Sequence, residues 1–166
     1  PAAAREPPQP KDVASVEDLY LTGLHLEQYR HATRRPEAYW REALRRDPDD
    51  SRVNNAMGLW HLHRGEFVAA AEHFGRAIAR LTGLNPNPRD GEPHYNLVLV
   101  QRLRGDFKKA YDAFYKATWN AAWRGPAYFA LAEIDGMRGD WERASDHLRR
   151  SLAAEERFEQ AWQFFR

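Results

Sequence analysis

A glycine followed by an acidic residue and an aromatic residue occurs three times in this chain at nearly regular spacing. The three copies are Gly65-Glu66-Phe67, Gly105-Asp106-Phe107 and Gly139-Asp140-Trp141. Their glycines lie 40 and 34 residues apart, and the alanines at 70, 110 and 144 keep the same steps. Several positions that share one spacing indicate an internal repeat of about 34 residues.

Each repeat is predicted to be a pair of helices joined by a short turn. Apolar residues recur with a helical period along most of the chain, and no alternating pattern of useful length favours strands. The glycine suits the end of the first helix, where a left-handed backbone is needed, and the aromatic residue then begins the second helix. A single pair of helices cannot cover its own apolar face, so we expect successive pairs to stack.

Small and aromatic residues recur at equivalent positions in three successive units. They are Met57, Gly58, Gly65, Phe67, Ala70, Phe74 and Ala77, then Leu97, Gly105, Phe107, Ala110, Phe114 and Ala117, and finally Tyr128, Leu131, Ala132, Gly139, Trp141, Ala144 and Leu148. This pattern resembles the tetratricopeptide repeat family. The resemblance implies an all-α fold, a right-handed α-solenoid of stacked antiparallel helix hairpins.

The repeat sets the expected boundaries. The repeat domain is predicted over residues 15–166, with units at about 17–50, 51–84, 91–124 and 125–158 and a partial fifth unit from 159. Residues 1–14 are expected to be an extended linker, because four of the ten prolines fall in the first ten residues. Ser15 and Asp18 resemble a capping box that begins the first helix. The first unit departs from the pattern, since its glycine turn is missing and Pro36 occupies the alanine site.

Charge and composition exclude several classes of function. The 166 residues carry 25 basic and 24 acidic side chains, a balance that argues against a nucleic-acid partner. No apolar run approaches the length of a membrane span, and the absence of cysteine excludes disulfides and thiolate sites. No phosphate-binding loop, nucleophile motif or histidine pair with ligand spacing is present, so we expect no cofactor, no metal and no catalysis by this segment. The expected location is the cytoplasm.

The family resemblance also implies a binding surface. In that family the first helices of successive units line a concave groove, whose ligand-facing positions here are Asn55, Leu59, His63, Tyr95, Asn96, Leu99, Arg102, Phe129, Glu133 and Met137. The clamp that some members use for a peptide carboxylate is not expected, because Leu59, Pro126 and Ala130 replace its polar residues. The apolar members favour a protein or peptide with an apolar face. A neighbouring domain of the same protein, or the chain's own first helix, is the alternative occupant.

A second interpretation concerns carbohydrate chemistry. The stretch from Trp119 to Trp123 resembles the repeat region of large bacterial multidomain proteins with β-rich modules, which implies an accessory or oligomerisation domain of a carbohydrate-active enzyme. Trp119 and Trp123 are four residues apart, so we expect them on one helix face, where they pack within the fold; stacking on a sugar is the alternative interpretation.

The last residues of the chain suggest self-association. Trp162, Phe164 and Phe165 form an apolar end that lacks a polar capping helix, and we expect the chain to be a segment of a longer protein. An uncovered apolar end predicts a weak homodimer through this part of the chain.

Overall fold

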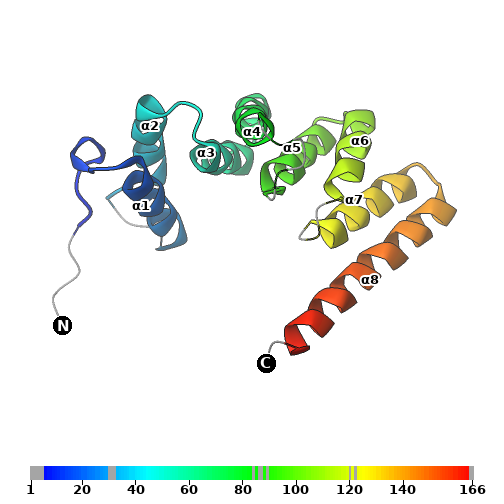
Figure 1. Cartoon of the computed structure of the whole chain (residues 1–166). Coiled ribbons are helices and arrows are strands. Elements are labelled where there is room, and N and C mark those ends of the chain that lie inside the picture. The colour runs from blue at the N-terminus through cyan, green and yellow to red at the C-terminus, as the bar shows by residue number, and fades with distance from the viewer. Residues whose placement is uncertain are drawn as a thin grey trace. The chain divides into compact units, whose positions relative to one another are not determined.

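The computed structural model describes residues 6–29, 33–83, 85, 88, 90–119, 121 and 123–164, with side chains up to residue 156. The secondary structure of these residues is helical throughout (Figure 1). A short 3₁₀ helix, Pro10–Asp12, precedes α1 (Val16–Tyr29), α2 (Pro36–Arg46), α3 (Ser51–His63), α4 (Phe67–Thr82), α5 (Glu92–Leu103), α6 (Phe107–Ala117), α7 (Arg124–Met137) and α8 (Trp141–Phe164). They form two compact units, unit 1 over residues 1–80 and unit 2 over residues 81–166. The predicted all-α hairpin fold is confirmed.

The three glycine turns have one geometry. Gly65, Gly105 and Gly139 adopt φ angles of 74°, 78° and 78°, in the left-handed region. In each turn the amide after the glycine donates to a carbonyl five residues earlier, as between Asp106 N and Gln101 O at 2.9 Å. This closing bond is the helix C-terminal motif that glycine favours, and the next helix begins at the aromatic residue of the repeat. The predicted role of the motif is therefore confirmed.

Two glycine-to-alanine replacements are expected to change stability in opposite directions. Gly105→Ala should lower the free energy of unfolding by about 1–2 kcal/mol, because an L side chain strains a left-handed backbone. Gly75→Ala should raise it by about 1 kcal/mol, since Gly75 is an exposed α4 residue with open space around an added Cβ. Urea denaturation followed by circular dichroism measures both, and a stabilised Gly105→Ala variant would contradict the turn geometry.

Unit 1 packs large rings of the second helices against glycines of the first helices. An added Cβ at Gly58 would lie 2.4 Å from the buried Phe74 ring, so only glycine fits there. Gly23 in α1 lies equally close to the buried Trp40, with 2.2 Å from an added Cβ to Trp40 Nε1. The repeat pattern does not predict the contact of Gly23 with Trp40. Gly23 stands 17 residues before Trp40, whereas Gly58 stands 16 residues before Phe74.

The N-terminal segment is not an extended linker where the structure describes it. Val13 is buried in the core of unit 1, and the Tyr39 hydroxyl donates to the Pro8 carbonyl at 2.7 Å. The Arg46 guanidinium donates to the Val13 carbonyl at 2.8 Å and is held by Glu42 at 2.8 Å. Hydrogen bonds from Arg45 and Arg46 lower the pKa of Glu42 to about 2. The linker prediction was wrong for Glu6–Ala14 because α2 supplies donors and an apolar site for this segment.

The first helix begins as the capping prediction requires. The Asp18 amide donates to Ser15 Oγ at 3.0 Å, and the same hydroxyl donates to the Asp18 carboxylate at 2.6 Å. The hydroxyl therefore satisfies one of the free amides at the start of α1.

Unit 2 buries the repeat positions of α6 against α7. Ala110, Phe114 and Ala117 share a core with Ala127 and Leu131. The corresponding position in α8 differs, because the Leu148 side chain is 42% exposed whereas its neighbour His147 is buried. At this position α8 therefore packs on α7 through polar contacts, and not through a large apolar side chain such as Phe74 or Phe114.

The α8 helix is longer than the repeat predicts. It continues without interruption from Trp141 to Phe164, across the expected start of a partial fifth unit at residue 159. No glycine or proline stands at that boundary, where Arg157 replaces the closing proline of the family, so nothing in the backbone ends the helix there. The side chains of Trp162 and Phe164, and all of Phe165, lie outside the described residues.

Candidate functional site

The first helices of unit 2 carry most of the predicted groove. We define the α5–α7 face as Tyr95, Leu99, Arg102, Phe129, Glu133 and Met137. An ion pair between the Arg102 guanidinium and the Glu133 carboxylate joins the two helices across this face. Next to the pair, the Tyr95 ring stacks on Trp123 with ring centroids 5.0 Å apart, and burial raises the pKa of Tyr95 above its usual value.

The outer part of the α5–α7 face is apolar. Phe129 is 51% exposed and Met137 is 60% exposed, and they lie two helical turns apart on α7 with Glu133 between them. Residues four apart on a helix share one side, so these three side chains form a continuous stripe. The opposite side of α7 is buried in the core through Leu131 and Ile134. Exposed apolar side chains beside a fixed ion pair suit a partner that presents both apolar and polar side chains.

The two predicted asparagines do not reach the surface. Asn55 in α3 and Asn96 in α5 are both buried, so their side chains are part of the helix packing rather than of a ligand-facing surface. The offsets that predicted them are those of the family, and here both positions are buried.

The α3 members of the predicted groove belong to unit 1. Leu59 is half-buried and His63 is exposed. The neighbouring His61 pairs with Glu66 at 2.6 Å, and its ring stacks on His73 at 5.3 Å. Burial first, and then the nearby His61 and Arg76, lowers the pKa of His73 to about 4. His73 therefore stays neutral near neutral pH and makes a 2.9 Å contact through Nδ1 with Asn54 Oδ1.

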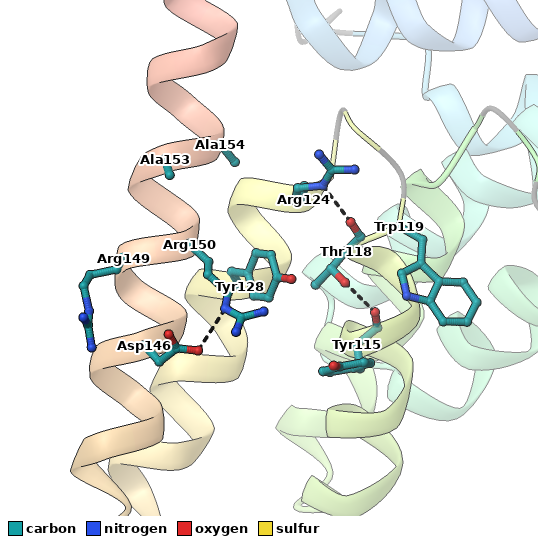
Figure 2. Close-up of a pocket in the computed structure, with 10 residues that line it drawn as sticks. All are labelled: Tyr115, Thr118, Trp119, Arg124, Tyr128, Asp146, Arg149, Arg150, Ala153 and Ala154. Atoms are coloured by element: carbon teal, nitrogen blue, oxygen red, sulfur yellow. Dashed lines mark hydrogen bonds and ion pairs between the residues drawn. The ribbon is translucent and has the colours of Figure 1, made fainter.

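A cleft of about 580 Å³ in unit 2 was not predicted from the sequence (Figure 2). It lies between the end of α6, the start of α7 and the middle of α8. Its lining combines aromatic rings, arginines and small side chains: Tyr115, Thr118, Trp119, Arg124, Tyr128, Asp146, Arg149, Arg150, Ala153 and Ala154. Most of these residues come from second helices, whereas the groove prediction considered only first helices.

The comparisons with known proteins agree with this architecture. Residues 125–150 match the family model of the tetratricopeptide repeat. A crystal structure of MamA is 21% identical over 90% of this chain and 84% of its own, with a TM-score of 0.75. The MamA fragment 41-end from Desulfovibrio magneticus RS-1 is 18% identical over 86% and 76%, with a TM-score of 0.69. PilW, described as a widely conserved type IV pilus biogenesis factor, is 20% identical over 82% and 61%, with a TM-score of 0.67.

This chain has the tetratricopeptide-repeat fold. The matched residues cover α7 and the first part of α8, which include the Gly139 turn and Ala144. At identities of 18–21% the property shared with MamA and PilW is the fold itself.

The two tryptophans after α6 do not share a helix face. The α6 helix ends at Ala117, so Trp119 and Trp123 lie beyond it. Trp119 is 65% exposed, whereas Trp123 stacks on Tyr95 within the fold. The expected shared helix face was therefore wrong, because α6 ends before the pair begins, and the expected packing within the fold is seen for Trp123.

Two further properties of the described helices bear on ligands and membranes. Among the described residues, no group of three or more histidine, aspartate and glutamate side chains is placed to hold a metal ion. No helix in the described ranges is both long and apolar enough to cross a bilayer.

Proposed function

We propose that this chain is a non-catalytic interaction scaffold that binds a protein or peptide through the α5–α7 face. The observation that carries the proposal is the exposure of Phe129 and Met137 beside the Arg102–Glu133 ion pair. Apolar side chains of this size, held on a rigid helix, lose little conformational freedom when a partner covers them. The ion pair would fix the orientation of the bound segment.

The partner is proposed to present an apolar face. A peptide or a neighbouring domain of the same protein meets this requirement, and the near balance of 25 basic and 24 acidic residues disfavours nucleic acid. The two charged groups of the face, Arg102 and Glu133, pair with each other, and no nucleophile beside a base stands among the residues of the face, which supports binding without bond making. A cytoplasmic location stays a prediction.

A role as an accessory domain of a carbohydrate-active enzyme is the second candidate. The exposed ring of Trp119 is the observation that favours it, because a free aromatic face can stack on a sugar ring. Trp123 does not add a second stacking surface, since its ring packs on Tyr95.

Phe129→Ala tests the proposed face. Peptides with one apolar side are selected from a displayed random library against the whole chain, and dissociation constants of the selected peptides are measured by calorimetry. The Phe129→Ala variant should bind them at least about tenfold more weakly, as expected for an aromatic residue at the centre of an interface. Val68→Ala is the matched control. Val68 is an apolar residue that is 61% exposed on α4, the second helix of its hairpin, and it lies outside the α5–α7 face. Equal affinity for the wild type and Phe129→Ala would contradict the proposal.

A further inference from the structure

The cleft between α6, α7 and α8 has the composition of a second binding site, separate from the α5–α7 face. Figure 2 shows Tyr128 of α7 at its centre, with Tyr115 and Trp119 on one side and Asp146 and Arg150 of α8 on the other. Its volume of about 580 Å³ falls in the range of ligand-binding clefts.

Positive charge exceeds negative charge in this cleft. Three arginines line it against a single carboxylate, Asp146. Arg150 is paired with that carboxylate at 2.9 Å, and its guanidinium lies 5.7 Å from the centre of the Tyr128 ring. Arg149, on the outer side of α8 in Figure 2, makes a long 3.4 Å contact with the Ser145 carbonyl. With Arg150 paired and Arg149 on the outer side, the cationic excess within the cleft is carried by Arg124.

Arg124 is held in place without being neutralised. Its Nε donates to the Thr118 carbonyl at 3.0 Å, which fixes the guanidinium at the upper end of the cleft. Within the described residues no carboxylate lies within ion-pair distance of Arg124. A guanidinium has five N–H donors in a rigid fork, so the two terminal nitrogens, which no described carboxylate contacts, can pair with a carboxylate from outside.

Aromatic surface lies beside these charges. Trp119 is 65% exposed and Tyr115 is 47% exposed. Neither ring has a ring partner among the described residues. Tryptophan, tyrosine and arginine are the residues that most often dominate the energetics of protein interfaces. Aromatic rings with guanidinium groups at one site match a ligand that carries both carboxylates and an apolar side chain.

We propose that the cleft binds an acidic peptide segment of a partner protein. Its carboxylates pair with Arg124 and Arg150, and an apolar side chain lies against Trp119. Sugar recognition is less favoured, because three arginines against one carboxylate form stronger hydrogen bonds with a charged acceptor than with a neutral hydroxyl. The site is independent of the α5–α7 face, because it uses α6, α8 and the start of α7.

The experiment uses a fluorescein-labelled peptide in which glutamates flank a phenylalanine, and a matched peptide with glutamines in their place. Anisotropy titrations of the whole chain should show binding of the glutamate peptide that weakens as salt is raised, because exposed charges are screened. The glutamine peptide should bind at least about tenfold more weakly. Arg150→Gln and Arg124→Gln should each reduce the affinity for the glutamate peptide by about tenfold.

Further variants distinguish binding in this cleft from binding elsewhere on the chain. Trp119→Ala changes an exposed side chain and leaves the core intact. It should also weaken the binding of the glutamate peptide. Arg143→Gln is the matched control, because Arg143 is a 70% exposed α8 arginine outside the cleft, and it should leave the affinity unchanged. Phe129→Ala should also leave it unchanged, which distinguishes the cleft from the proposed α5–α7 face.

Four results would overturn the proposal. They are no binding of the glutamate peptide, equal binding of the glutamine peptide, binding that the cleft variants do not change, and binding of a neutral oligosaccharide that Trp119→Ala abolishes while the glutamate peptide fails to bind. Circular dichroism of each variant confirms that it is folded. Since Trp119→Ala does not touch the core, a folding defect of Arg124→Gln would still leave the proposal decided by the other variants.

Discussion

Phe74→Ala is expected to lower the free energy of unfolding by about 3–5 kcal/mol. The ring is fully buried in unit 1 and fills the space over Gly58, where no Cβ could fit beside it. Truncation to alanine leaves a cavity that the glycine side of α3 cannot close, because a glycine has no side chain to move into it. Urea denaturation followed by far-ultraviolet circular dichroism measures the loss.

The same repeat position in the other units supplies matched variants. Phe114 is also fully buried, so Phe114→Ala should cost a similar amount. Leu148→Ala should cost less than about 1 kcal/mol, because much of the Leu148 side chain already contacts solvent. A Leu148→Ala variant that loses as much stability as Phe114→Ala would contradict the packing of α8 described above.

Asp135→Ala is expected to lower the free energy of unfolding by about 2–4 kcal/mol. The Asp135 carboxylate is buried between two helices, 2.8 Å from His147 Nδ1 and 3.5 Å from the Tyr111 hydroxyl. Burial, and then the nearby carboxylate, raises the pKa of Tyr111 above its usual value. Without the carboxylate, the buried His147 ring loses its hydrogen-bond acceptor and no water can replace it freely.

Two variants isolate this effect. Asp135→Asn keeps an acceptor in place, so it should cost clearly less than Asp135→Ala. Asp112→Ala removes a carboxylate from α6, next to Tyr111 in sequence, and should change stability by no more than about 0.5 kcal/mol. Equal losses in the free energy of unfolding for Asp135→Ala and Asp112→Ala would show that the buried pair of Asp135 and His147 does not contribute to stability.

The hairpins and their turns were predictable because their signals are local. A left-handed backbone at residues 65, 105 and 139 requires glycine, and the aromatic residue two positions later marks the next helix start. The contact of Gly58 with Phe74 follows from the same repeat. The counterpart in the first unit, Gly23 with Trp40, does not follow from it because one extra residue separates the two positions.

The binding surfaces were less predictable because they depend on tertiary contacts. Helical spacing placed Arg102, Phe129 and Glu133 on first helices, and the structure brings Arg102 and Glu133 together. Helical spacing alone could not show that Asn96 is buried, nor that Trp119 lies beyond the end of α6. The arginine cleft joins residues from three helices at no regular interval, so no sequence period marks it.

The identical closing bonds at the three glycine turns have a consequence for how the molecule assembles. Every such turn is completed by groups five residues apart, so a hairpin can form before distant parts of the chain meet. Proteins dominated by contacts of this short range reach their native state rapidly. A change in the distance between successive hairpins, such as the step of 40 instead of 34, is therefore expected to leave the rate at which each turn forms unchanged.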